Sequence, residues 1–114
     1  MITIYHNPRC QKSRLGVKAL EESGQAFTIV KYLETPLTVE QLKTIVQQLG
    51  LSPLELVRTQ EAIWKSDFKG KVLSNKEIIQ AMITHPKLME RPIVINGDKA
   101  VIGRPTERIL DLLT

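Results

Sequence analysis

The sequence has little of what several large protein classes require. Cysteine occurs once in 114 residues, so the chain cannot form an internal disulfide, and the disulfide framework of small secreted domains is excluded. No apolar run approaches the roughly 20 residues that cross a bilayer. The apolar segment at residues 2–5 is too short for a signal peptide and has no basic leader. We therefore expect a cytoplasmic protein that does not associate with membranes.

Aromatic residues and runs of one charge are also scarce. Aromatics make up 4% of the chain, and the 16 basic and 12 acidic residues give a net charge of +4 without forming a basic run. This composition offers no platform for stacking nucleic-acid bases, so a nucleic-acid partner is not expected. His6, His85 and Cys10 do not form a metal-ligand cluster, and the sequence has no glycine-rich phosphate loop. We expect no bound metal or cofactor.

The order of predicted elements indicates a small α/β protein. We expect strands at residues 2–5, 27–31, 93–95 and 100–102, and helices at about residues 10–23, 39–49, 53–58, 75–84 and 106–113. Residues 64–73 give no clear pattern. The first β-α-β unit predicts a parallel pair, and the turn at residues 96–99 predicts an antiparallel hairpin. This is the element order of the thioredoxin fold, in a single domain over residues 1–114 with a helical insertion at about residues 37–86.

Cys10 is the candidate reactive residue. It lies between the first strand and the first helix, where free N–H groups and the helix dipole favour a thiolate, the nucleophilic form of cysteine. Many free cysteines are instead small buried hydrophobes. The flanking Pro8, Arg9 and Lys12 argue against an apolar burial site, so we favour a functional thiol.

Two polar neighbours bear on this thiol. Ser13 completes a Cys-x-x-Ser pattern, so no second cysteine can resolve an oxidised or adducted Cys10, and a thiol from another molecule is required. Ser13 is a candidate hydrogen-bond donor to the thiolate, although a serine taken by itself is more typical of a first-turn residue that satisfies backbone groups. His6 either supports the thiolate and moves a proton or is a solvent-exposed loop residue.

Three arginines are candidates for binding an oxyanion. Arg91 and Arg104 each precede a proline and flank the predicted hairpin, and Arg58 lies in the middle helical region. Each alone is typical of a surface residue. If they converged on one thiolate, their planar guanidinium groups would fit a tetrahedral oxyanion. The Arg91-Pro92 bond, just before a strand, is also a candidate cis peptide.

Four segments, in the same order along the chain, resemble those of the glutaredoxin-dependent (ArsC-like) arsenate reductase family. The resemblance is greatest to the short, YfgD-type members of the ArsC/Spx superfamily. The segments are residues 4–14, 32–36, 90–94 and 102–105. The resemblance runs nearly end to end. It implies a thioredoxin-like fold, Cys10 as the catalytic residue, and an arsenate site formed by Arg58, Arg91 and Arg104. It also implies that His6 and Ser13 support the thiolate.

The resemblance further implies a reaction and its partners. Cys10 attacks arsenate, glutathione serves as co-substrate in reducing the adduct to arsenite, and glutaredoxin with further glutathione regenerates the thiol. We expect a monomer. Two alternatives stay open: an Spx-like regulator that binds RNA polymerase, and a glutathione-dependent oxidoreductase that acts on disulfides. The Spx-like regulators typically carry Cys-x-x-Cys and lack the second Arg-Pro arginine, so Ser13 and Arg104 favour the reductase.

Overall fold

The computed structural model describes residues 1–113, which form two compact units. The first unit combines residues 1–35 with the segment from Arg91 onward, and the second is Pro36–Glu90. The helical insertion predicted at about residues 37–86 falls within the second unit. No described helix is both long enough and apolar enough to span a bilayer.

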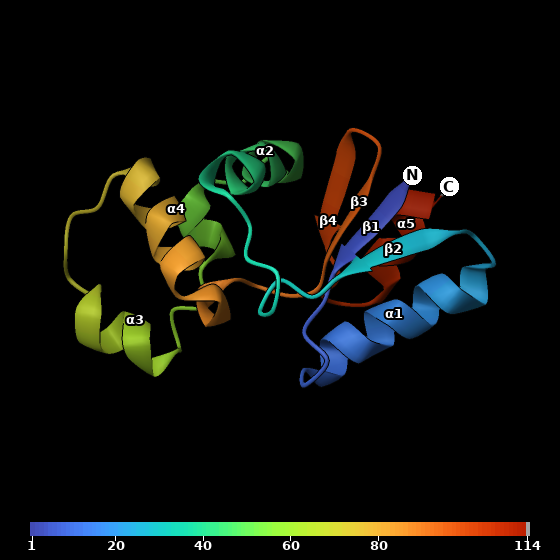
Figure 1. The fold of residues 1–114 in the computed structure, drawn as a ribbon, viewed down its shortest axis with the longest axis horizontal. Helices are drawn as coiled ribbons and strands as arrows, with labels where there is room; N and C mark the ends of the chain where they lie inside the picture. Colours follow the sequence, from blue (N-terminus) through green and yellow to red (C-terminus); the bar gives the residue numbers. More distant parts are fainter. Residues whose placement is uncertain (114) are drawn as a thin grey trace. The chain divides into compact units, whose positions relative to one another are not determined.

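The first unit is built on a mixed sheet with the strand order β2-β1-β3-β4 (Figure 1). Its strands are β1 (Ile2–Tyr5), β2 (Phe27–Val30), β3 (Ile93–Asn96) and β4 (Lys99–Ile102). Strand β1 runs parallel to β2 and antiparallel to β3, and β3 pairs antiparallel with β4. The predicted parallel pair and hairpin are both confirmed.

The register of the sheet brings three chain segments to one end of it. Tyr5, the last residue of β1, lies opposite Ile93, the first residue of β3, and Ile93 lies opposite Ile102, the last residue of β4. The segments that follow β1, precede β3 and follow β4 therefore leave the sheet at the same end. Asn96 and Lys99 lie at the other end, beside the hairpin turn.

Two helices complete the first unit. Helix α1 (Gln11–Ser23) connects β1 to β2, and α5 (Glu107–Leu113) packs on β3 and β4 and contacts α1. Helix α1 ends at Gly24, whose φ of 76° is favourable for glycine and whose N–H bonds to the Glu21 carbonyl. The buried core residues between sheet and helices are Ile2, Ile4, Leu20, Val94, Ile109 and Leu112.

Gly16 allows α1 to approach the start of β3 closely. A Cβ atom at this position would lie 2.9 Å from Pro92 Cγ and 3.2 Å from side-chain carbons of Ile109 and Ile4. The proline ring is rigid and follows Arg91 directly, so it cannot give way as a flexible side chain would. The glycine therefore holds α1 tightly against the segment that carries Arg91.

We expect Gly16→Ala to destabilise the protein by up to about 2 kcal/mol in urea unfolding. Alanine gains about 1 kcal/mol of helix propensity over glycine, but overpacking a tight core costs roughly 1–3 kcal/mol, and the contact with Pro92 decides the sign. Lys18→Ala, on an exposed position of the same helix, is the matched control and should change stability little. A stabilised Gly16→Ala protein would contradict this account of the packing.

The second unit is helical. Its elements are α2 (Val39–Leu49), the 3-10 turn η1 (Pro53–Leu56), α3 (Ala62–Asp67), α4 (Asn75–Thr84) and the 3-10 turn η2 (Pro86–Leu88). Helices α2 and α4 contact each other and begin with the capping boxes predicted at Thr38 and Ser74. In the stretch without a clear sequence pattern, the buried Trp64 stacks on Phe68 with ring centres 5.3 Å apart.

The helix predicted at residues 53–58 is wrong, because only the short turn η1 forms there. Val57 leaves the turn with extended backbone and pairs with Met89 in an antiparallel bridge. The Arg58 N–H donates to the Leu88 carbonyl over 2.6 Å, and the Glu90 N–H donates to the Leu56 carbonyl over 2.9 Å. These long-range bonds satisfy backbone groups that a continuing helix would otherwise pair locally.

Candidate thiol site

Cys10 lies at the end of the sheet where β1, β3 and β4 meet, as the N-cap residue of α1. Asn7 shapes the loop that leads to it. The Asn7 carbonyl accepts the Cys10 N–H over 3.0 Å, and the Asn7 Oδ1 accepts the Arg9 N–H over 3.0 Å. These are the bonds of a tight Asx-type turn, and they fix where the helix begins and where the sulfur lies.

A buried polar network lies beneath the thiol. The His6 ring is 7% exposed, and its Nδ1 lies 2.6 Å from the Ser13 Oγ. The same oxygen accepts the Asn7 N–H over 3.0 Å. Burial, followed by the positive charges of Lys31 and Arg14, lowers the pKa of His6. In the neutral tautomer that carries its ring proton on Nε2, the His6 Nδ1 accepts the Ser13 hydroxyl proton.

The hydrogen bonds of Ser13 differ from those expected from the sequence. The hydroxyl contacts described by the structure are with His6 and Asn7, whereas the sequence suggested a hydroxyl bond to the thiolate. The group of Ser13 that acts on the sulfur is its backbone N–H. Ser13 therefore joins the histidine loop to the helix start and leaves its amide for Cys10.

Arg91 and Arg104 lie beside the sulfur. The Arg104 Nη2 is 3.5 Å from the Cys10 Sγ, and its Nε donates to the Arg91 carbonyl over 2.7 Å. The Arg91 side chain also forms a hydrogen bond with Cys10. Both arginines are half-buried, and both Arg-Pro bonds, 91-92 and 104-105, are cis. The hairpin strands carry the two arginines to this end because one precedes β3 and the other follows β4.

The surroundings of Cys10 favour the thiolate. Burial raises the pKa of the thiol, because the side chain is only 8% exposed. The hydrogen bond from Arg91, the Ser13 N–H, the charge of Arg91 and the Lys12 N–H act in the opposite direction and bring the pKa down to about 7. Half of the Cys10 side chains are therefore ionised near neutral pH, compared with a few per cent of ordinary thiols.

We expect the reactivity of Cys10 to rise with pH and to reach half its maximum near pH 7, the pKa of the thiol. The thiolate is the reactive form, and a lowered pKa means that it persists to lower pH than in a free thiol of pKa about 8.5. The rate of alkylation by iodoacetamide between pH 5 and pH 10 measures this, with glutathione as the reference thiol. A midpoint at or above that of glutathione would contradict the proposed stabilisation.

Arg58 has different surroundings. It lies in the second unit, where its Nη1 is 3.6 Å from the Glu61 Oε2 and its Nε is 3.4 Å from the Glu90 Oε1. The structure thus brings together Cys10, His6, Ser13, Arg91 and Arg104, and it places Arg58 in an ion-pair network of its own unit. Its assignment to the oxyanion site stays a prediction.

Asn7 is the site residue that the sequence reasoning missed. It is 7% exposed, and it contacts Arg9, Cys10 and Ser13 through its side chain and backbone. The available signal was the position of an asparagine directly before a proline, which is typical of a turn. Among residues 1–113, no group of three metal-ligating side chains comes together.

Comparison with known proteins places these residues in a family. The model of the ArsC family matches residues 5–112. An arsenate reductase of Haemophilus influenzae is 42% identical over 114 residues, covering 98% of both chains. The uncharacterised protein YfgD of Escherichia coli is 45% identical over 114 residues, covering 98% of this chain and 96% of the relative.

A solved structure shares the fold as well as the sequence. An arsenate reductase from Vibrio cholerae has a TM-score of 0.92 and 44% identity, covering 97% of this chain and 96% of that one. This likeness confirms the predicted thioredoxin-like α/β fold. Sequence motifs, architecture and near full-length relatives agree, and we conclude that the chain belongs to the ArsC family.

Proposed function

We propose that this protein is an arsenate reductase that takes its electrons from glutathione and glutaredoxin. The observation that carries the proposal is the contact of one thiol of low pKa with the guanidinium groups of Arg91 and Arg104. Relatives and structural neighbours named as arsenate reductases support the choice of substrate. Dependence on glutathione implies a reducing, cytoplasmic setting, and we infer that the protein acts there as a monomer.

In the first step, the Cys10 thiolate attacks the arsenic of arsenate. A sulfur–arsenic bond forms, and one oxygen leaves as water after it is protonated. Negative charge stays on the remaining oxygens, so Arg91 and Arg104 are placed to stabilise it with several N–H donors each. Both guanidiniums are held near the sulfur before substrate binds, one of them by its bond to the Arg91 carbonyl, so little reorganisation is needed during the reaction.

In the second step, a glutathione thiolate attacks the Cys10 sulfur of the adduct. The electron pair of the sulfur–arsenic bond remains on arsenic, which becomes trivalent and leaves as arsenite, and Cys10 is left in a disulfide with glutathione. Glutaredoxin with further glutathione then cleaves this disulfide and restores the thiol. The chain has a single cysteine, so both reducing thiols must come from outside it.

The family resemblance also implies roles for His6, Ser13 and Arg58. His6 and Ser13 hold the loop and the helix start in place through their 2.6 Å contact, and we propose that they keep the thiolate oriented. The family resemblance assigns Arg58 to the substrate. Its carboxylate partners Glu61 and Glu90 would then compete with the oxyanion for the guanidinium, and arsenate binding at Arg58 would require these ion pairs to loosen.

Arsenate-dependent oxidation of NADPH, coupled through glutathione reductase, tests the proposal. The protein should support turnover only when arsenate, glutathione and glutaredoxin are all present, and arsenite should accumulate. Reduction of glutathione mixed disulfides without any arsenate turnover would favour the general oxidoreductase instead. Absence of both activities, with co-purification of the RNA polymerase α subunit, would favour the regulator.

A further inference from the structure

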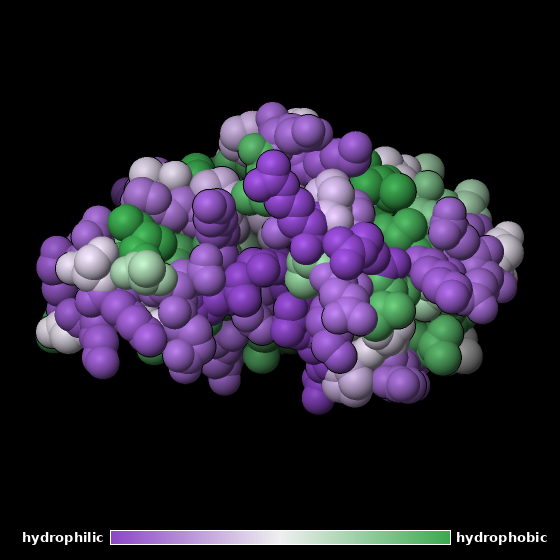
Figure 2. All heavy atoms as spheres, turned by 90° about the horizontal axis from the view of Figure 1, so that it is seen from below, coloured by the Kyte–Doolittle hydropathy of each residue, from purple (hydrophilic) through white to green (hydrophobic). Residues whose placement is uncertain are grey.

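Four exposed cations lie on or beside the loop and helix start that carry the thiol, in addition to the half-buried Arg91 and Arg104. They are Arg9, Lys12, Arg14 and Lys31, and we call this set the basic rim. All four belong to the first unit. In the view from below, hydrophilic residues cover much of the visible face (Figure 2).

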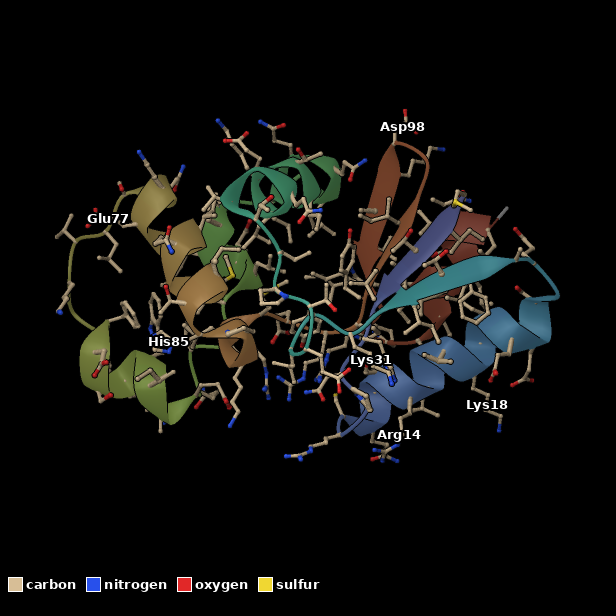
Figure 3. All side chains as sticks on the ribbon, in the orientation of Figure 1. Arg14, Lys18, Lys31, Glu77, His85 and Asp98 are labelled. Carbon is tan, nitrogen blue, oxygen red and sulfur yellow. The ribbon has the colours of Figure 1, made fainter. Side chains whose placement is uncertain are left out.

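Backbone and side-chain bonds bring the members of the basic rim to the thiol loop. The His6 N–H donates to the Val30 carbonyl over 2.9 Å, which places Lys31 beside the loop although it follows β2. The Arg14 Nη1 donates to the Pro8 carbonyl over 2.9 Å, which holds its guanidinium against the same loop. Figure 3 shows Arg14 and Lys31 both near the beginning of α1.

Among residues 1–113, no carboxylate forms an ion pair with a member of the basic rim. The ion pairs of Arg58 with Glu61 and Glu90 lie in the second unit. Burial is the largest cause of the lowered pKa of His6, and the positive charges of Lys31 and Arg14 lower it further, so their field reaches the loop. The positive charge of the basic rim attracts an anion. Arg91 and Arg104 already supply the hydrogen-bond donors for a tetrahedral oxyanion, so the rim is available for a different anionic group.

We propose that the basic rim, with Arg14 and Lys31 at its centre, binds the carboxylates of the small thiol that reduces Cys10. Two independent observations support this: a single cysteine that needs an external thiol, and exposed cations on or beside the thiol loop that form no ion pair with the described part of the chain, residues 1–113. Glutathione carries a carboxylate at each end of an extended tripeptide, with the thiol between them. The inference rests on the proposed function only for the identity of this reductant.

The chemistry of this step can be followed without arsenate. Methyl methanethiosulfonate converts Cys10 to a methyl disulfide, a small uncharged stand-in for the adduct. A glutathione thiolate that attacks the Cys10 sulfur forms a Cys10–glutathione disulfide and releases methanethiolate, so that one disulfide replaces another with no net change in oxidation. Attack at the methyl sulfur instead releases free Cys10 and a methyl–glutathione disulfide. Mass spectrometry of the intact protein distinguishes the two products, and the rate at which the Cys10–glutathione disulfide appears reports attack at the Cys10 sulfur.

The test compares charged and uncharged thiols on matched variants. Each exposed ion pair contributes a factor of about 2 to 3, so the double variant Arg14→Gln/Lys31→Gln should react about fivefold more slowly with glutathione. Its rate with 2-mercaptoethanol should stay unchanged, and its rate with glutathione diethyl ester, which keeps the ammonium group but has no carboxylate, should not fall. Dividing the glutathione rate by the 2-mercaptoethanol rate removes any effect of the substitutions on the leaving thiol or on access.

Lys99→Gln is the matched control, because Lys99 is exposed and lies at the far end of the same sheet. An unchanged rate ratio in the double variant would overturn the proposal, as would an equal fall in Lys99→Gln, which would indicate net charge alone. A loss confined to reduction of the Cys10–glutathione disulfide by glutaredoxin would also overturn it and assign the rim to a protein partner. None of these outcomes depends on arsenate turnover, so failure of the proposed function remains distinguishable.

Discussion

Cys10→Ser is expected to abolish arsenate turnover while the fold is retained. Oxygen is close in size to sulfur, and the N-cap position tolerates serine well, so α1 should still begin at Gln11. A serine hydroxyl is not ionised at neutral pH, and neither Arg91 nor the helix start can make it so. We expect turnover to fall on the order of 1,000-fold or more, as when other enzymes lose their nucleophile.

Two measurements on the same variant separate loss of the nucleophile from loss of the fold. The coupled NADPH assay reports turnover, and circular dichroism with urea unfolding reports the fold. Cys10→Ala serves as the second variant, since it removes the nucleophile without adding a hydroxyl. If either variant folded normally and still turned over arsenate at a substantial rate, Cys10 would be rejected as the nucleophile.

The second large effect is expected for Arg91→Gln. The Arg91 hydrogen bond and charge both favour the thiolate and together oppose the effect of burial on the Cys10 pKa. Without them, the pKa should rise from about 7 towards or above the ordinary value of about 8.5, at which roughly 3% of thiols are ionised at pH 7. Loss of a charged donor at the oxyanion adds on the order of a 100-fold fall in turnover.

The pH dependence separates these two contributions. The thiolate deficit of Arg91→Gln should disappear as the pH rises through the new pKa, because the wild-type thiol is already ionised there. The deficit in oxyanion stabilisation should remain at high pH. Alkylation by iodoacetamide measures the first contribution alone and should recover fully by pH 10, whereas arsenate turnover should not. An unshifted alkylation midpoint would show that Arg91 does not control the thiol.

Arg104→Lys is the companion variant for the oxyanion contribution. The substitution keeps the positive charge but loses the planar group that bonds the Arg91 carbonyl and reaches the sulfur. We expect a raised KM for arsenate and a smaller change in the alkylation midpoint than in Arg91→Gln. Kinetics equal to wild type would mean that Arg104 is only a surface residue.

Much of the fold was predictable because the capping and turn residues in the sequence agree with where the helices and the hairpin begin and end in the structure. Gly24 ends α1 in the left-handed conformation, and the Thr38 and Ser74 capping boxes begin α2 and α4 as the sequence indicates. The turn after Asn96 closes the predicted hairpin. The failure at Val57 has the opposite cause: its pairing with Met89, far along the chain, overrides a good local helix start at Pro53.

The sequence by itself determined that one cysteine stands at a helix start, that no second thiol can resolve it, and that arginines with Arg-Pro motifs flank a hairpin. Those are properties of neighbours along the chain. Only the tertiary structure decided that Arg91 and Arg104 reach the Cys10 sulfur, that Ser13 bonds His6 and Asn7, and that Lys31 joins the thiol loop. These follow from strand register and long-range hydrogen bonds, whose partners no local pattern specifies.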